Sequence, residues 1–92
     1  MSNQPPLQQI AKTLGVRIRQ LRRKKGWSQG EFSELCNIHR SHMGKIERGE
    51  TNVRLSTLLT IAGTLETELE TLLRGAEVSG KESALDSTKG QS

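Results

Sequence analysis

The chain has 92 residues, of which 32% are hydrophobic, with one Trp, one Phe and no Tyr. This length allows one small domain with a modest aliphatic core. It leaves no room for a buried catalytic cleft and a cofactor domain, so we expect neither an enzyme nor a cofactor. The single cysteine excludes an intramolecular disulfide. The apolar runs are too short to cross a bilayer and the N-terminus shows no secretory signal, so the sequence predicts a cytoplasmic protein without a membrane partner.

The formal net charge of +4 conceals an uneven distribution along the chain. Residues 1–54 hold eleven Lys and Arg against four Glu, whereas residues 55–92 hold three against six acidic residues. A concentration of positive charge is typical of a surface that binds a polyanion, but a solvated basic face has the same composition. Charge alone therefore leaves both interpretations open.

The N-terminal third of the chain predicts a short arm followed by a long helix. Residues 1–6 are expected to form a flexible arm, with two prolines placed where a helix begins. From Leu7, apolar residues recur every three or four positions, which predicts an amphipathic helix that ends near Gly26. These positions are Leu7, Ile10, Ala11, Leu14, Ile18 and Leu21. Trp27 follows, and we expect it to pack beneath the first two helices rather than to stack on a base or a partner.

A second helix is predicted to begin directly after Ser28. The Ser28 hydroxyl can accept a hydrogen bond from a free backbone N–H at the helix start, and Glu31 can reach back to complete a capping box. Phe32, Leu35 and Cys36 follow at helical spacing. They predict one apolar face for this helix.

A sharp turn and a third helix come next. Asn37 tolerates a left-handed backbone and Ile38 can fill the corner. The third helix is predicted from Arg40 to Arg48, and Gly49 suits the left-handed position that ends a helix. Its inward side carries Met43, Ile46 and Glu47, and its outward side carries Arg40, Ser41 and Lys45. Two short helices with an apolar inside and a hydrogen-bonding outside are typical of a unit that reads DNA.

Leucines predict two further helices after a polar connection at residues 50–54. The fourth helix is traced by Leu55, Leu58, Leu59, Ala62 and Leu65, and the fifth by Leu69, Leu72 and Leu73, ending near Gly75. Residues 7–75 thus form one predicted domain, and the polar residues 76–92 are predicted to be a disordered tail. Because one small domain cannot bury all of these leucines, Leu65, Leu69 and Leu72 are the candidate surface of a homodimer.

Two short strings within the stretch from Leu14 to Leu73 are specific. Ser28-Gln29 opens the second helix, and Ile46-Glu47-Arg48-Gly49 closes the third. Placed between amphipathic helices, these strings resemble the Cro/phage-repressor type of helix-turn-helix domain, the XRE-like family. The resemblance implies an all-α, compact five-helix bundle that binds double-stranded DNA. The chain departs from the family pattern at the helix ends, with His39 as a weak N-cap, Val53 and Arg54 before the fourth helix, and Glu66 where a glycine is usual.

The resemblance and the predicted helices together assign roles to individual residues. An ion pair between Arg22 and Glu47 is implied as a structural link between the first helix and the reading helix. Base reading is assigned to Arg40, Ser41 and Lys45, with His39 and His42 flanking them. The candidate phosphate ligands are Gln29, Ser28, Arg48, Asn52 and Arg54.

Cys36, His39 and His42 are spaced by threes, which suggests a metal site. No fourth ligand lies nearby in the sequence, and Cys36 belongs to the inward face while the histidines should point outward. We therefore predict a buried cysteine and no metal.

The predicted function is a sequence-specific transcriptional regulator, in its simplest form a repressor that binds an inverted-repeat operator as a homodimer. Three alternatives stay open. They are a controller protein of a restriction–modification system, a DNA-binding antitoxin whose C-terminal tail holds a protein partner, and a protein-interaction helix bundle that does not bind DNA.

Overall fold

The computed structural model describes residues 7–74, and this range contains five α-helices and no strand. The helices are α1 (Leu7–Lys24), α2 (Gln29–Cys36), α3 (Arg40–Arg48), α4 (Leu55–Leu65) and α5 (Leu69–Leu73). The predicted all-α fold with five helices is confirmed over this range. The predicted arm and tail, residues 1–6 and 76–92, lie outside the described residues.

Local signals in the sequence define the ends of α2 and α3. Ser28 accepts a hydrogen bond from the backbone N–H of Glu31, and the Glu31 carboxylate accepts one from the backbone N–H of Ser28, so the capping box is complete. Asn37 ends α2 with a left-handed φ of 58°, and Gly49 ends α3 with a φ of 71°. Both helices therefore stop where short polar or glycine residues make the left-handed backbone accessible.

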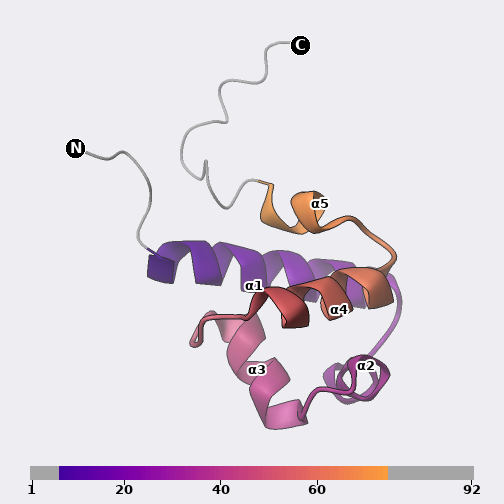
Figure 1. Ribbon diagram of the computed structural model, residues 1–92. Helices are drawn as coiled ribbons and strands as arrows, with labels where there is room; N and C mark the ends of the chain where they lie inside the picture. Colours follow the sequence, from indigo (N-terminus) through magenta and orange to yellow (C-terminus); the bar gives the residue numbers. More distant parts are fainter. Residues whose placement is uncertain (1–6, 75–92) are drawn as a thin grey trace, which may run out of the picture.

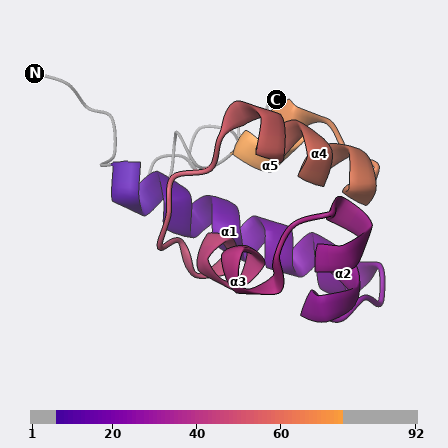
Figure 2. The same ribbon diagram turned by 60° about the horizontal axis from the view of Figure 1, so that its bottom comes forward.

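The long helix α1 packs against α3 and α5 (Figure 1). The short helix α2 packs against α3 and α4, and α4 packs against α5. In the views of Figures 1 and 2, α2 and α3 lie on one side of α1 and α5 lies on the other, with α4 beside α5. Side chains from all five helices meet in one hydrophobic core. Its buried members are Leu14, Ile18, Phe32, Cys36, Met43, Ile46, Leu58, Ile61, Ala62, Leu65 and Leu72. Among residues 7–74, no helix is long and apolar enough to span a membrane.

Trp27 belongs to this core, as predicted. It is partly buried, and its ring stacks on that of Phe32 with 5.8 Å between the centroids and 15° between the planes. This contact joins the turn after α1 to the inward face of α2.

The structure corrects the expected apolar face of α2 at Leu35. The buried positions of this helix are Phe32, Ser33 and Cys36, whereas the side chain of Leu35 is 55% exposed. Because successive helical residues are rotated by about 100°, these three positions centre the inward face and leave Leu35 at its edge.

The expected dimer surface is wrong for two of its three leucines. Leu65 is 4% exposed and Leu72 is 1% exposed, so both belong to the core of the single chain, and Leu69 is partly buried against that core. The short helix α5 folds back onto α1 and α4, which gives these leucines partners that helical spacing alone could not reveal. The leucines that remain exposed on α4 are Leu55 and Leu59.

The backbones of α1 and α3 approach each other closely at Gly15. A Cβ atom added to Gly15 would lie 2.6 Å from the carbonyl oxygen of Ile46, and closer still to that of Glu47. Only a residue without a side chain permits this approach. The position of α3 relative to α1 is thus determined by direct contact between two backbones.

Candidate nucleic-acid interface

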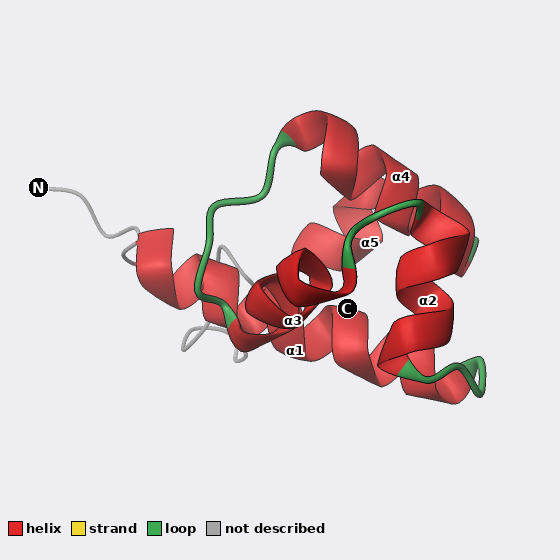
Figure 3. Cartoon of the chain, turned by 90° about the horizontal axis from the view of Figure 1, so that it is seen from below, coloured by secondary structure: helices red, strands yellow, loops and turns green. Residues whose placement is uncertain are grey.

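The third helix, labelled α3 near the centre of Figure 3, has one polar face that is exposed to solvent. Arg40, Ser41, His42 and Lys45 are all exposed, while Met43, Ile46 and Glu47 are buried. Arg40 and Lys45 make no hydrogen bond or ion pair with any of residues 7–74, so both cations are available to a ligand. The Arg40 guanidinium lies over the start of α2, with its Cζ 3.8 Å from the Cβ position of Gly30.

His39 caps α3 more effectively than the sequence suggested. It is the N-cap residue, with an extended backbone, and its Nδ1 accepts a hydrogen bond from the backbone N–H of Ser41 at 3.3 Å. The Ser41 Oγ lies 2.9 Å from the same Nδ1. An imidazole nitrogen thus fills the role that Ser, Thr or Asp usually fills at this position.

A buried carboxylate at Glu47 links α3 to α1. Glu47 accepts two hydrogen bonds from Arg22, from Nε to Oε2 at 2.8 Å and from Nη2 to Oε1 at 3.0 Å. The two side chains are 8% and 1% exposed. Nη1 of Arg22 also donates to the carbonyl of Trp27 at 2.9 Å. The structure contains the implied ion pair, which joins α1, the following turn and α3.

Gln29 is held by the same carboxylate. Its Nε2 donates to Oε1 of Glu47 at 3.2 Å, so one of its two amide hydrogens is engaged within the protein. The other hydrogen and the backbone N–H groups at the start of α2 remain as the donors that a phosphate could use. Ser28, the neighbouring candidate, donates its backbone N–H and accepts at its hydroxyl within the capping box, so the hydroxyl hydrogen is the donor it can offer to a phosphate.

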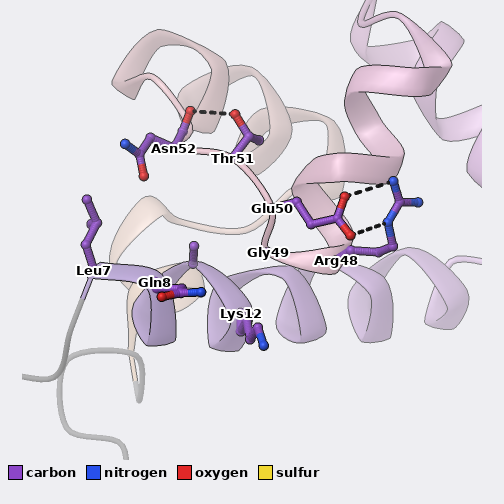
Figure 4. Close-up of a pocket in the computed structure, with 9 residues that line it drawn as sticks. Leu7, Gln8, Lys12, Arg48, Gly49, Glu50, Thr51 and Asn52 are labelled. Carbon is purple, nitrogen blue, oxygen red and sulfur yellow. Dashed lines mark hydrogen bonds and ion pairs between the residues drawn. The ribbon is translucent and has the colours of Figure 1, made fainter.

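The cation at the end of α3 already has a partner. Arg48 donates to Glu50 from Nε at 3.0 Å and from Nη2 at 3.1 Å, and both side chains are about half exposed (Figure 4). The hydrogen bond from Arg48 lowers the pKa of the Glu50 carboxyl, so this residue carries its negative charge at neutral pH. The predicted phosphate ligand Arg48 is therefore partly neutralised in the free protein.

Most of the predicted contact residues lie together. One shallow depression is lined by Gln29, His39, Arg40, Ser41, Gly44, Lys45 and Arg48. His42, Asn52 and Arg54 are exposed but do not line it. A second open groove lies between the start of α1 and residues 48–52, with Asn52 on its wall (Figure 4).

Two features of this surface were missed by the sequence analysis. Gly44 is buried within α3 beneath the depression, and a Cβ added there would lie 3.1 Å from Nη1 of Arg48 and 3.6 Å from Oε1 of Gln29. A glycine inside a nine-residue helix was the available signal, since glycine weakens a helix unless close packing requires it. The sequence also did not indicate that Gln8 and Lys12 line the second groove, because only the folded chain brings them beside residues 48–52.

The residues that suggested a metal do not converge. Cys36 is buried, and burial raises the pKa of its thiol, whereas His39 and His42 are exposed. No group of three His, Cys, Asp or Glu side chains within residues 7–74 is arranged to hold a metal ion.

Comparison with known proteins places this geometry in a family. The helix-turn-helix family model HTH_3 matches residues 18–72. The control protein C.SmaI of Serratia marcescens is 38% identical over 64 residues, which cover 70% of this chain and 76% of that protein. The crystal structure of the restriction–modification controller protein C.AhdI from Aeromonas hydrophila has a TM-score of 0.65 at 39% identity, covering 67% of this chain and 94% of that one.

A third similar structure is that of SinR, a master regulator for biofilm formation, in complex with DNA. It has a TM-score of 0.63 at 34% identity and covers 65% of this chain and 97% of that one. The chain belongs to the helix-turn-helix family of DNA-binding transcription regulators.

Proposed function

We propose that this protein is a sequence-specific transcriptional regulator that acts in the cytoplasm as a homodimer on an inverted-repeat operator. Each α3 occupies a major groove, and the two grooves are one helical turn, about 34 Å, apart. Bound in this way, the dimer represses a promoter by occluding it. The proposal rests chiefly on one observation. The cations Arg40 and Lys45, which form no hydrogen bond or salt bridge among residues 7–74, lie on the exposed face of a helix whose inward side is fixed by a buried ion pair.

The proposed contacts divide into base readers and phosphate ligands. Arg40, Ser41 and Lys45 face the base edges, with His39 and His42 at the margin of the groove. The backbone of the duplex is contacted by Arg48, at the end of α3, and by Gln29, Ser28, Asn52 and Arg54, which lie outside this helix. Backbone contacts set the position of the protein, whereas base contacts set its sequence preference.

Selection of bound sequences from a random duplex pool tests the proposal directly. We expect enrichment of an inverted repeat, and binding that weakens steeply with salt because each phosphate contact releases counterions. A protein that enriches no sequence, or that does not bind duplex DNA at low salt, would support the alternative of a protein-interaction bundle.

Replacing Arg40 with alanine should reduce the preference for the selected operator over random DNA by about 1–3 kcal/mol, because a bidentate arginine–guanine contact carries that much discrimination. The matched control is Arg54→Ala, which removes an exposed cation from a proposed phosphate contact. This change should weaken specific and random duplexes alike. Fluorescence anisotropy with both duplexes measures the difference. Equal effects of the two variants on the two duplexes would contradict the assigned roles.

Replacing Glu50 with glutamine should strengthen DNA binding. The change removes a negative charge beside the reading helix and frees the Arg48 guanidinium for a phosphate, so we expect roughly three- to tenfold tighter binding to all duplexes at low salt. The gain should shrink as salt is raised. Glu34→Gln, at an exposed position of α2, is the control for the change in net charge. An equal gain in both variants would show that Arg48 is not restrained by Glu50.

We propose that the homodimer forms through α4, since two of the predicted leucines are buried. Leu55 and Leu59 are four residues apart on this helix and are 63% and 54% exposed. Leu59→Glu should convert the dimer to a monomer in light scattering at tens of micromolar. Val16→Glu, at a 51% exposed position of α1, should leave the dimer intact. A Leu59→Glu protein that stays dimeric would place the contact elsewhere.

A narrower role as a restriction–modification controller is favoured by the similarity to C.SmaI and C.AhdI, which are 38% and 39% identical. Neighbouring genes for an endonuclease and a methyltransferase, and binding to the shared promoter, would support this role. An antitoxin role depends on residues 76–92, which lie outside the described range. Co-purification of a toxin with the full chain tests it.

A further inference from the structure

The cap of the reading helix fixes the hydrogen positions of two side chains. Nδ1 of His39 accepts a hydrogen bond from the backbone N–H of Ser41, with 3.3 Å between the two nitrogens. The same Nδ1 lies 2.9 Å from the Oγ of Ser41. A backbone amide can only donate, so Nδ1 must be the acceptor, and the imidazole hydrogen is on Nε2. The same nitrogen cannot then donate to the Ser41 hydroxyl.

The contact between Oγ and Nδ1 is therefore made by the hydroxyl hydrogen of Ser41. A hydroxyl has one hydrogen and two acceptor lone pairs. With its hydrogen held by His39, the exposed Ser41 side chain presents only acceptors to the surroundings. Arg40 and Lys45, its neighbours on this face, can only donate.

In the major groove, hydrogen-bond donors are restricted to amino groups. Adenine presents N6 and cytosine presents N4, whereas guanine and thymine present the acceptors O6, N7 and O4. We propose that Ser41 selects an amino-bearing base, adenine or cytosine, against guanine or thymine, and that His39 is the positioning residue that sets this polarity. The proposal rests on the proposed function, since it concerns the base contacts of the same helix.

Each base pair carries one of these amino groups, on one strand only. Ser41 therefore determines which strand holds the amino-bearing base at its position. In the selected operator, this appears as a preference for adenine or cytosine over guanine or thymine at one position of each half-site. The loss of a single hydrogen bond corresponds to roughly three- to tenfold in affinity.

The test is sequence selection with the wild-type protein and three variants. Ser41→Ala identifies the operator position that Ser41 contacts, because in this variant the base preference should disappear at that position only. His39→Ala releases the Ser41 hydroxyl hydrogen, so the preference at that position should fall to within about twofold while other positions keep theirs. His39→Asn is the matched control, because its side-chain oxygen can accept in place of Nδ1 and retain both the cap and the preference.

A second measurement does not depend on the fold of the His39 variants. Duplexes are prepared with purine in place of adenine, or 2-pyrimidinone in place of cytosine, at the identified position, so that only the amino group is lost. Wild-type protein should bind these duplexes roughly three- to tenfold more weakly, and Ser41→Ala should bind them as well as it binds the normal duplex.

The proposal would be overturned if the selection enriched guanine or thymine at the operator position that depends on Ser41. Equal binding of wild-type protein to duplexes with and without the amino group, or a preference unchanged in a folded His39→Ala protein, would also overturn it. In each of these cases wild-type protein still selects an operator, and the proposed function stands. A wild-type protein that selects no sequence contradicts the proposed function itself.

Discussion

Replacing Glu47 with glutamine should lower the free energy of unfolding by about 3–5 kcal/mol, because the change leaves the buried guanidinium of Arg22 without its counter-charge. The side chain of Arg22 is 8% exposed. Within residues 7–74, Glu47 is the only carboxylate to which it donates a hydrogen bond. A loss of this size is a large share of the stability of a small domain. Urea denaturation followed by circular dichroism measures it.

The chain contains its own control for this experiment. Arg48 and Glu50 also form a pair with two hydrogen bonds, but both side chains are about half exposed. Glu50→Gln should leave the free energy of unfolding close to that of the wild-type protein, since water solvates either partner when an exposed pair is broken. Similar losses in Glu47→Gln and Glu50→Gln would contradict the role of burial.

Replacing both members of the buried pair separates the charge from the packing. Arg22→Met combined with Glu47→Leu leaves no unpaired charge, so this double variant should be more stable than Glu47→Gln alone. It still loses the hydrogen bonds to Trp27 and Gln29. We therefore expect it to stay below the wild-type protein in stability.

Replacing Gly15 with alanine should also destabilise the protein, by about 2–3 kcal/mol, although alanine is the better helix former. The added Cβ meets the backbone carbonyls of Ile46 and Glu47, which cannot move without shifting α3 relative to α1. We expect operator affinity to fall together with stability. Thermal denaturation and anisotropy on the same samples measure the two effects.

Replacing Gly63 with alanine should raise the stability of the protein, the opposite of the effect expected at Gly15. Gly63 lies in α4, and a Cβ added there meets no atom within 4 Å. Gly63→Ala should therefore stabilise the protein by about 0.5–1 kcal/mol through helix propensity. A Gly15→Ala protein as stable as wild type would show that the two backbones are not in close contact at Gly15. A destabilised Gly63→Ala protein would contradict the open space at Gly63.

The sequence predicted best those features that depend on residues close together in the chain. The capping box at Ser28, the left-handed Asn37 and the glycine at the end of α3 each involve neighbours within about four positions, and all three are present. The bounds of α3, from Arg40 to Arg48, follow from these signals. The outward face of α3 followed in turn from the helical period.

Features that depend on tertiary contact were not predictable in the same way. Leu65 and Leu72 are buried because the five-residue α5 folds back, and a helix of that length is too short for its period to define a face. Gly15 has no local signal that distinguishes close packing from a weak helix position. Glu66 adopts a left-handed φ of 58° where a glycine is usual, while its carboxylate accepts a hydrogen bond from Lys25 at 2.7 Å.

The backbone contact between α1 and α3 at Gly15 bears on how an operator is chosen. In the proposed complex, a tilt of α3 would bring its backbone into collision with α1, so we expect the duplex to supply the adjustment in bend, twist and groove width. The energy of that deformation depends on the base steps involved, including steps that no side chain touches. If the proposed homodimer binds two half-sites, the central bases between them should therefore alter affinity through the flexibility of the DNA.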